Sequence, residues 1–492
     1  MLQELLNSAK SDTLLRAPAY VAGRWVTGDA PAERVGPYAR RVVTHSYPAT
    51  ALQIEEALEF AAASAKAVAA FAPATRAAVL ERASTLAGAH REDVARLIAL
   101  ELGKPLKDGR GEMDRVADTF AVCANETRHI GGDTVPVAGW ARGLGNTALT
   151  YRAPAGVALA ITPFNAPANL LAHKLGASFA AGNTTLVKAP PQAPATTAAI
   201  VALLLEAGAP AEAVQLLHGG GDVGAALCAG APVSVISFTG SPETGAAVAR
   251  AAGAKRLVLE LGGNAATVVC EDADIAGAAR VCARTGYTNS GQSCISVQRV
   301  YVQRSRFDEF IESFRTEVGA LRVGDPLDPD TDVGSMVDEQ AAARVQKWTE
   351  EAVARGARLV LGGVRDGATF SPTIVADPPG DSSLVVEEVF GALVAVLPFD
   401  DFAEVLETCN QSRFGLQAGL FTNDITRIFT AWRELQVGGL VVNGSSNYRL
   451  DHVPFGGVKD SGFGRESPAY MIDDYTIVKT LMVRGVSIWG ER

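Results

Sequence analysis

Two short stretches of this chain hold residue types that can act as a nucleophile and a base. Residues 286–294 read Gly-Tyr-Thr-Asn-Ser-Gly-Gln-Ser-Cys, and residues 260–264 read Glu-Leu-Gly-Gly-Asn. Cys294 follows a Gly-Gln turn, and Glu260 stands before a Gly-rich turn 34 positions earlier. A thiol and a carboxylate on two loops are typical of an activated nucleophile and its base. The two stretches therefore predict a catalytic pair.

The chemistry open to this pair is addition to a carbonyl group. A cysteine adds to the carbonyl carbon, and the oxyanion that forms needs hydrogen-bond donors. The Cys294 backbone N–H and the Asn165 side chain are the candidate donors. With an aldehyde, the adduct can pass a hydride to a nicotinamide, and Glu260 could then activate the water that hydrolyses the thioester. A single Cys, Glu or Asn is more often a core or turn residue, so the hypothesis depends on their combination.

Length and composition describe an ordinary globular chain. Its 492 residues exceed one hydrophobic core, which predicts two or three domains. Hydrophobic residues make up 48% and charged residues 20%, as is typical of soluble proteins. The formal net charge is -10 and no basic block is present, which argues against nucleic acid as a partner.

The cysteines, the N-terminus and the histidines favour a cytoplasmic protein without a metal site. The six cysteines are scattered without a CxxC pair, which suits a reducing compartment. The first ten residues include Glu4 and lack a long apolar run, so they make a poor signal peptide. No apolar stretch approaches the roughly 20 residues of a membrane span. The six histidines lack metal-ligand spacing such as HExxH.

The elements that must position the pair alternate between strands and helices. Residues 54–129 show helical patterns, and from residue 156 a strand, a loop and a helix repeat. The expected strands are 157–161, 184–188, 214–217 and 233–238, and a second set follows Glu260. Such repeats predict doubly wound parallel sheets with ligands at the carboxyl ends of their strands. The 240–245 loop opens a helix and could hold a pyrophosphate; the alternative is a tight turn capped by Ser241.

Two further strands, near 147–152 and 475–483, have no obvious partner in either sheet. They suggest a small sheet for oligomerisation, although an ordinary edge strand is the alternative. The predicted fold class is therefore α/β, with two Rossmann-like doubly wound domains and a small β oligomerisation arm. The predicted boundaries are 1–127 and 147–261 for the cofactor-binding domain, 262–460 for the catalytic domain, and 128–146 and 472–488 for the arm.

Seven motifs along nearly the whole chain resemble the aldehyde dehydrogenase superfamily. The stretches that match, in the order of that family, are 162–167 (Thr-Pro-Phe-Asn-Ala-Pro), 186–188 (Leu-Val-Lys), 238–245 (Phe-Thr-Gly-Ser-Pro-Glu-Thr-Gly), 260–264, 289–294 (Asn-Ser-Gly-Gln-Ser-Cys), 387–391 (Glu-Glu-Val-Phe-Gly) and 454–462 (Pro-Phe-Gly-Gly-Val-Lys-Asp-Ser-Gly). The pattern is most similar to the lactaldehyde, phosphonoacetaldehyde and non-phosphorylating glyceraldehyde-3-phosphate branch.

The resemblance implies a role for each matching residue. It implies Cys294 as nucleophile, Glu260 as general base and Asn165 as oxyanion donor. Lys174 and Glu466 match positions often tied to catalysis or proton relay. The implied cofactor-binding residues, with Lys188 and Glu388 at the riboses and Phe390 by the nicotinamide ribose, are Thr162, Pro163, Phe164, Lys188, Gly240, Ser241, Gly245, Leu261, Glu388 and Phe390. It also implies a homodimer or homotetramer.

One departure from the family leaves the cofactor open between NAD and NADP. Three residues after Lys188, many NAD-preferring members carry a Glu that binds the adenine ribose, and this chain has Pro191. Without that carboxylate a 2′-phosphate would not be repelled, and Lys188 could pair with it.

The family positions that line the aldehyde tunnel here hold few aromatic residues. The expected substrate-binding residues are Arg115, His173, Ser293, Ile295, Arg449 and Phe455. A guanidinium binds carboxylate, phosphate, phosphonate or sulfonate with two hydrogen bonds. Arg115, His173 and Arg449 thus predict a cationic mouth for a short aldehyde with an anionic tail. The alternative is that the two arginines form structural ion pairs with Asp451 and with Glu112 or Asp114.

Other options stay open at the level of sequence. The prediction includes a hydroxyaldehyde beside the anionic tail, and a succinate-semialdehyde-type enzyme is an alternative. Ser293 replaces the arginine that the glyceraldehyde-3-phosphate enzymes place before the cysteine, which weakens that option. A CoA-acylating enzyme or acyltransferase is less favoured because such relatives commonly lack the base at Glu260. A non-catalytic protein is disfavoured because Cys294, Glu260 and Asn165 are all present.

Overall fold

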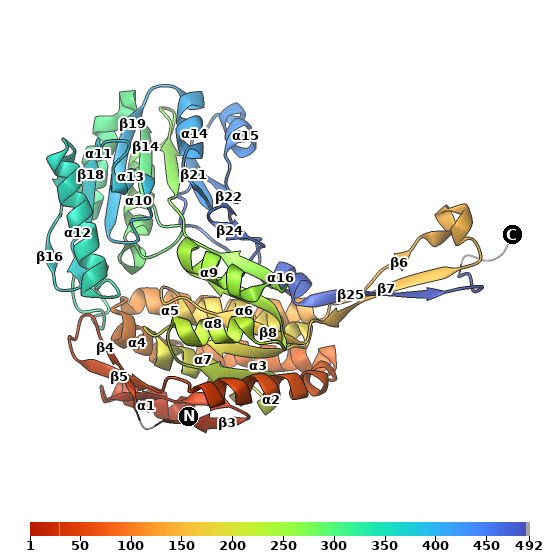
Figure 1. Ribbon diagram of the computed structural model, residues 1–492. Helices are drawn as coiled ribbons and strands as arrows, with labels where there is room; N and C mark the ends of the chain where they lie inside the picture. Colours follow the sequence, from red (N-terminus) through yellow and green to blue (C-terminus); the bar gives the residue numbers. More distant parts are fainter. Residues whose placement is uncertain (29, 489–492) are drawn as a thin grey trace.

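The computed structural model describes residues 1–28 and 30–488, and two large sheets dominate it (Figure 1). The first sheet has eight strands in the order β24-β12-β11-β8-β9-β10-β2-β3. Its five neighbouring central strands are parallel. They are β12 (Arg256–Glu260), β11 (Val233–Thr239), β8 (Val157–Ile161), β9 (Thr184–Lys188) and β10 (Val214–Leu217). Antiparallel strands flank them, namely β24 (Gly462–Phe463), β2 (Ala19–Val21) and β3 (Arg24–Val26).

Within residues 1–28 and 30–488, helices α1 to α9 accompany this sheet. The most buried is α6, in which Pro167 occupies the first turn and Gly182 ends the helix in a left-handed conformation. Every residue of α6 is buried, so this helix fixes the position of the side chains it carries. The helices are α1 (Leu2–Lys10), α2 (Ala51–Ala69), α3 (Pro73–Ala89), α4 (Arg91–Leu102), α5 (Leu106–Thr127), α6 (Pro167–Ala181), α7 (Pro194–Glu206), α8 (Gly221–Ala229) and α9 (Pro242–Ala252).

The second sheet has seven strands in the order β15-β18-β19-β14-β13-β21-β22. All neighbours are parallel except the β15 edge. The strands are β15 (Arg358–Leu361), β18 (Thr373–Ala376), β19 (Leu393–Phe399), β14 (Arg299–Gln303), β13 (Ala266–Val269), β21 (Gln417–Phe421) and β22 (Gly439–Val442). The accompanying helices are α10 (Ile275–Gly286), α11 (Phe307–Gly319), α12 (Glu339–Ala354), α13 (Ser383–Val386), α14 (Phe402–Asn410) and α15 (Ile425–Glu434). Two parallel, doubly wound sheets confirm the predicted fold class.

The chain returns from the second sheet to the first near its end. The short strand β24 pairs with β12, and α16 (Pro468–Asp474) then packs against α6 and α5. This return places residues 455–466 beside the end of β12, where Glu260 lies. Three smaller sheets are β1 (Leu15–Ala17), β5 (Val42–Ser46) and β4 (Ala32–Val35); β16 (Arg365–Asp366) and β17 (Thr369–Phe370); and β20 (Phe414–Gly415) and β23 (Val458–Lys459).

An antiparallel sheet of three strands projects from the body as an arm (Figure 1). The strands are β6 (Thr134–Val135), β7 (Thr147–Pro154) and β25 (Thr476–Val483). The two strands for which the sequence offered no partner thus pair with each other, from Thr476 opposite Pro154 to Val483 opposite Thr147. The predicted boundary at 147 assigned β7 to the cofactor-binding domain, whereas its hydrogen bonds run to β25 and β6. The other predicted boundaries stay predictions.

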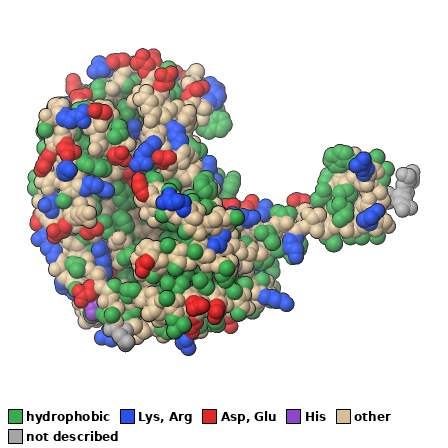
Figure 2. All heavy atoms as spheres, in the orientation of Figure 1, with side chains coloured by type: hydrophobic (Ala, Val, Ile, Leu, Met, Phe, Trp, Pro, Cys, Tyr) green, Lys and Arg blue, Asp and Glu red, His purple; other side chains and the backbone are tan. Residues whose placement is uncertain are grey.

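Apolar side chains gather at the outer end of the arm (Figure 2). Trp140 and Leu144, in the turn between β6 and β7, are 70% and 65% exposed.

No single helix within residues 1–28 and 30–488 is long and apolar enough to cross a membrane. The pair α2 and α3 passes that test together by length and composition, with a bend of 110° between them.

Candidate active site

Cys294 ends a turn with unusual backbone geometry. Asn289, Ser290 and Gly291 all have positive φ, at 52°, 55° and 73°. A run of left-handed residues is costly for any side chain and persists only when its surroundings hold it. Gly291 has a further constraint, since a Cβ there would lie 2.0 Å from the Gly391 carbonyl oxygen. The turn is therefore pressed against the 387–391 motif.

The side chain of Asn289 joins this turn to the loop that carries Asn165. Its Nδ2 donates to the Asn165 carbonyl at 3.0 Å and to the Gln292 carbonyl at 3.1 Å. Lys104 Nζ also donates to the Asn165 carbonyl, at 3.0 Å. Neither the Asn165 side-chain amide nor the Cys294 backbone N–H forms a hydrogen bond with another described residue. Both predicted oxyanion donors are thus held by the backbone and free to donate.

The two glycines after Glu260 let three motifs meet. A Cβ on Gly262 would lie 2.6 Å from Glu388 Oε2, and a Cβ on Gly263 would lie 2.1 Å from the Cys294 carbonyl oxygen. The Gly263 N–H donates to Glu388 Oε1 at 2.8 Å. The motifs that begin at Glu260 and Glu387 and the one that ends at Cys294 are therefore in direct contact, as a shared site requires.

Glu260 lies at the end of β12 and is 3% exposed. Neither carboxylate oxygen has a hydrogen-bond partner. Burial, and then the charge of Glu466, raise its pKa well above the usual value. The pKa of the Cys294 thiol rises to about 12, first through burial and then through Glu388 and Glu260. Burial thus favours the neutral form of both groups, and Glu260 can accept the Cys294 proton only when its own carboxyl group is ionised.

Glu466 is also buried but has the opposite electrostatics. Its Oε2 pairs with Lys174 Nζ at 3.0 Å, and its Oε1 pairs with Arg449 Nη1 at 2.9 Å. Burial alone would raise its pKa, but Lys174 and Arg449 lower the pKa to about 2. Lys174 also donates to Ser237 Oγ at 3.0 Å. The two residues predicted from the family's proton-relay positions thus form a buried ion pair near Glu260.

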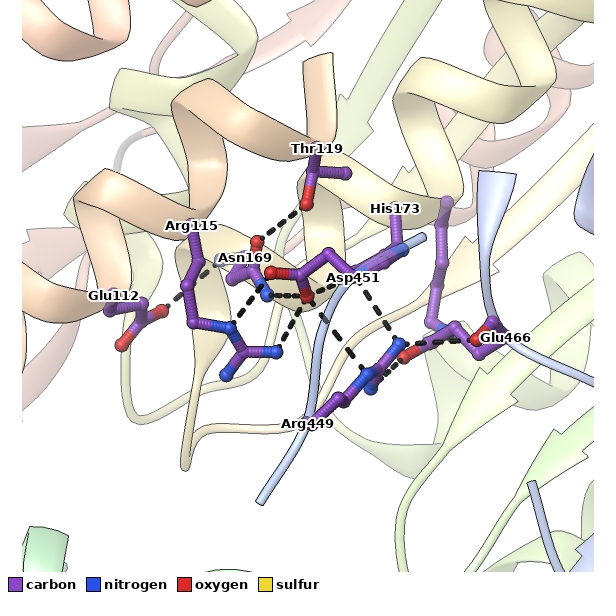
Figure 3. Close-up of polar contacts among 9 residues, drawn as sticks. Glu112, Arg115, Thr119, Asn169, His173, Arg449, Asp451 and Glu466 are labelled. Carbon is purple, nitrogen blue, oxygen red and sulfur yellow. Dashed lines mark hydrogen bonds and ion pairs between the residues drawn. The ribbon is translucent and has the colours of Figure 1, made fainter. Parts of the chain in front are cut away.

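Arg115, His173 and Arg449 meet around one carboxylate, that of Asp451 (Figure 3). Arg115 donates to both of its oxygens, at 2.6 and 3.0 Å. His173 Nε2 lies 2.8 Å from Oδ1, and Arg449 Nε lies 3.9 Å from it. The three predicted residues therefore lie together, but the Asp451 carboxylate lies among them and offsets part of their positive charge. For Arg115 the ion-pair alternative describes the geometry found, with Asp451 as the partner.

Apolar side chains lie between this cluster and the cysteine. Ile295, Phe455 and Leu416 form a small buried group against which Cys294 packs. The Arg449 guanidinium carbon lies 4.1 Å from the centre of the Phe455 ring. Arg449 thus lies against the same apolar group on which Cys294 packs. Ser293 accepts a weak hydrogen bond at 3.4 Å from the Ile295 N–H.

A cavity of about 330 Å³ opens beside the first sheet, between α8 and α9. Lys188 is 7% exposed, and burial lowers its pKa to about 8, opposed by Asp222. No described residue forms a hydrogen bond or ion pair with its ammonium group. Thr162 Oγ1 and Thr239 Oγ1, at the ends of the strands, are buried without partners. The lining residues include Ile161, Lys188, Gly220, Gly224, Phe238, Thr244 and Val248.

The other predicted cofactor residues lie where the chain leaves β8, β11 and β12, and in the 387–391 motif. Ser241 caps α9 by accepting from the Thr244 N–H at 3.3 Å, so the turn is capped as the alternative interpretation expected. Leu261 packs on α9, where a Cβ at Gly245 would lie 2.6 Å from it. Phe164 meets Phe390 edge to face, with ring centres 5.9 Å apart. Gly240, Pro163 and Glu388 belong to the same three loops, and Pro191 is exposed.

Several residues of the site were not predicted as such from the sequence. Asn169 Nδ2 donates to Asp451 at 3.1 Å. Lys104 and Glu112 form a buried ion pair at 2.6 Å, and Glu112 also accepts from the Ala168 N–H at the start of α6. Glu112 and Arg115 lie three residues apart on α5, a spacing that places both side chains on one face and could have indicated Glu112. Within residues 1–28 and 30–488, no group of three or more His, Cys, Asp or Glu side chains is arranged to hold a metal ion.

This fold and site define a class of α/β enzymes in which a thiol and a carboxylate meet between two doubly wound parallel sheets. Residues 25–481 match the aldehyde dehydrogenase family. The chain belongs to that family and is an oxidoreductase that acts on aldehydes.

Individual relatives cover almost the whole chain. It is 40% identical over 458 residues to a 3-sulfolactaldehyde dehydrogenase of Priestia aryabhattai, which covers 93% of this chain and 96% of the relative. The structure of aldehyde dehydrogenase 21 from Physcomitrella patens, solved with the reaction product succinate, matches with a TM-score of 0.93 and 34% identity over 97% of this chain and 100% of that one. A glyceraldehyde-3-phosphate dehydrogenase from Methanocaldococcus jannaschii, complexed with NADP, matches with a TM-score of 0.88 and 32% identity over 93% and 100% of the chains.

Proposed function

We propose that this enzyme uses NAD or NADP to oxidise a short aldehyde with an anionic tail to the corresponding acid. One observation carries the proposal: Cys294 packs against the apolar group that contains Phe455, and the Arg449 guanidinium lies over the Phe455 ring, so a nucleophile and a cationic group border the same apolar group. A substrate only a few bonds long can therefore reach both. The relative named for 3-sulfolactaldehyde, which carries a sulfonate, supports a tail of this kind.

The residues around the 330 Å³ cavity fit a dinucleotide. Lys188 offers an unpaired ammonium group at the end of β9, and the start of α9 offers backbone N–H groups to a pyrophosphate. When bound, the cofactor would accept the hydride from the substrate. Phe164 and Phe390 would hold its nicotinamide end near Cys294. Because Pro191 supplies no carboxylate, we propose that both cofactors are used, and kcat/KM for each tests this: a preference for NAD above about a hundredfold would contradict it.

In the first step Cys294 Sγ adds to the aldehyde carbon while its proton passes to a base. The high pKa of the thiol means that the cysteine is neutral before substrate binds. Glu260, when ionised, is the base placed to take this proton. The Cys294 N–H and the Asn165 side-chain amide would stabilise the oxyanion. Such donors typically contribute on the order of 3 kcal/mol each to the transition state.

After hydride transfer the acyl group is held as a thioester on Cys294. Glu260 first releases the proton it took from Cys294 to solvent and then takes a proton from water, which attacks the thioester carbon. Cys294 leaves as thiolate and receives this second proton from Glu260, which restores the ionised carboxylate. The unpaired, buried carboxyl group of Glu260 suits this role because no hydrogen bond ties it to one position. The same carboxyl group favours hydrolysis over transfer of the acyl group to coenzyme A.

A panel of short aldehydes that differ only in their tail tests the proposed function. The tails are sulfonate, carboxylate, phosphonate, phosphate and methyl, and the formation of NAD(P)H is followed by absorbance with and without coenzyme A. We expect at least one anionic tail to give a kcat/KM about tenfold or more above the methyl tail. A preference for the methyl aldehyde would contradict the anionic tail, and formation of acyl-CoA would indicate the acylating alternative. A carboxylate preference would identify a semialdehyde substrate.

We further propose that the arm mediates assembly into a homodimer or homotetramer in the cytoplasm. Ile477 and Leu481 lie four residues apart on one face of β25 and are 43% and 57% exposed, a face that a second copy would cover. The free cysteines agree with a reducing compartment. Leu481→Asp should shift the sedimentation coefficient toward that of a monomer; an unchanged value would contradict the role of the arm.

A further inference from the structure

We infer that Asp451 limits the substrate to tails that carry a single negative charge. The inference rests on the proposed function and makes its substrate class more precise. Sulfonates and carboxylates carry one charge near neutral pH, whereas phosphate monoesters carry close to two. Asp451 is thus assigned as a residue that determines specificity, without direct participation in the chemistry.

The geometry around Asp451 is that of an anion site already filled by the protein. Its carboxylate is 6% exposed and lies among Arg115, Asn169 and His173, all within 3.1 Å. Thr119 in turn donates to the Asn169 Oδ1 at 3.0 Å, so the Nδ2 group must face Asp451 (Figure 3). Asp451 is thereby held in place, and the hydrogen bonds from His173 and Arg115 overcome the effect of burial and lower the pKa of this carboxyl. It is therefore ionised whenever substrate binds.

The charges of the connected cluster leave one positive charge for a ligand. Lys174, Arg449 and Arg115 contribute three positive charges. Asp451 and Glu466 contribute two negative charges. Burial and Arg449 lower the pKa of His173, which keeps that ring neutral. The adjacent Lys104–Glu112 ion pair is neutral overall.

Arg115 and Arg449 differ in what they can still offer. The Arg115 side chain is 37% exposed and uses Nε and one terminal nitrogen on Asp451. The Arg449 side chain is 7% exposed. Its Nη1 binds Glu466 Oε1, its Nη2 donates to the Glu466 carbonyl at 3.2 Å and lies 3.3 Å from His173 Nε2, and its buried Nε has no hydrogen-bond partner. Arg115 thus keeps one terminal nitrogen without a described partner, and Arg449 keeps only its Nε.

A tail bound at these two arginines therefore lies next to the Asp451 carboxylate. One negative charge is matched by the net charge of the cluster. A second would be unmatched and would face Asp451 within a few ångström, where like charges repel strongly in a partly buried site. We expect this repulsion to lower kcat/KM for dianionic tails on the order of tenfold or more relative to monoanionic tails of the same length.

The test compares three aldehydes of equal chain length at pH 8: one with a sulfonate, one with a phosphate monoester and one with the methyl ester of that phosphate. The methyl ester keeps the phosphate shape but carries a single charge. We expect the sulfonate and the methyl ester to be oxidised with similar kcat/KM and the phosphate monoester about tenfold or more less efficiently.

Asp451→Asn removes the charge and retains an oxygen for Arg115. This variant should raise the phosphate-to-sulfonate ratio of kcat/KM about tenfold or more. Asp114→Asn is the matched control, because Asp114 lies on the same helix as Arg115 but pairs with Arg91 at the surface. The control should leave the ratio unchanged.

The outcomes separate this inference from the proposed function. Equal kcat/KM for phosphate and sulfonate in the unmodified enzyme, with both above a methyl tail, would overturn the role of Asp451 and leave the proposed function standing. A preference for the methyl tail over every anion would overturn both. If Asp451→Asn does not fold, the comparison of the phosphate with its methyl ester in the unmodified enzyme still tests the inference, because equal kcat/KM for the two would overturn it.

Discussion

Two neighbouring buried carboxyl groups, Glu260 and Glu466, differ in their hydrogen-bond partners and in the direction of their pKa shifts. They influence each other's charge, yet Glu260 has no hydrogen-bond partner and a raised pKa, whereas Glu466 has two cationic partners and a lowered pKa. The same contrast separates the Cys294 turn, whose reactive groups are unpaired, from Asp451, whose carboxylate accepts hydrogen bonds from Arg115 and Asn169 and pairs with His173. In this site the groups expected to exchange protons have no hydrogen-bond partners, whereas the groups that hold charges in place form ion pairs and hydrogen bonds.

The sharpest way to break this contrast is to remove the unpaired thiol. Cys294→Ala should abolish NAD(P)H formation, with a loss of about 10⁴-fold or more, because no other described cysteine lies in the site. Initial rates at saturating aldehyde and cofactor measure the loss. Cys409→Ala, which also removes a mostly buried thiol, is the control and should retain activity. Residual turnover by Cys294→Ala within tenfold of the unmodified enzyme would contradict a covalent role.

The second test removes the proton-accepting ability of the unpaired carboxyl group. Glu260→Gln should lower steady-state turnover by about 10²- to 10⁴-fold, since a general base typically contributes that much. If thioester hydrolysis is the step that fails, rapid mixing should still show a burst of NAD(P)H of at most one equivalent per active site. In the unmodified enzyme the acidic limb of the pH profile should lie above the ordinary glutamate pKa, because the pKa of Glu260 is raised. The exposed Glu59→Gln serves as the control.

Loss of a cationic partner of Glu466 should lower the stability of the fold. Lys174→Met removes one partner of Glu466 and should lower the free energy of unfolding by about 3 kcal/mol, the usual cost of leaving a buried charge with an incomplete partner set. Denaturant titration measures this. Lys347→Met breaks an exposed pair with Glu351 and should cost at most about 0.5 kcal/mol. Similar losses of unfolding free energy for the two variants would show that the buried ion pair stabilises the fold no more than the exposed one.

The pH dependence of stability should have opposite signs for the two groups. Glu466 has a folded pKa of about 2, so its contribution is present above its unfolded pKa and is lost as pH falls from that value toward 2. Glu260 has a raised folded pKa, so its stabilising effect is present below its unfolded pKa and is lost as pH rises through the folded pKa. Glu260→Gln should therefore raise Tm slightly at alkaline pH and have little effect at acidic pH. An alkaline decrease in Tm would contradict the sign.

The sequence by itself determined the fold class and the chemistry. Alternating strands and helices require parallel sheets whose loops meet at one edge, and glycines two or three positions from Cys294 and Glu260 mark places where backbones must touch. Gly263 and Gly291 show why, since a Cβ at either would overlap a carbonyl oxygen of the opposite loop. Such signals depend on residue type and on spacing along the chain, so they can be read from the sequence alone.

Only the tertiary structure decided which charges pair. Arg115 and Asp451 are separated by 336 positions, and the sequence left open whether Arg115 binds a ligand, Glu112, Asp114 or Asp451. The pairing of β7 with β25 was likewise fixed only when chain segments far apart in sequence came together. Charge pairing and strand pairing depend on distance in space, because electrostatic interactions and hydrogen bonds act over a few ångström, and spacing along the chain does not determine that distance.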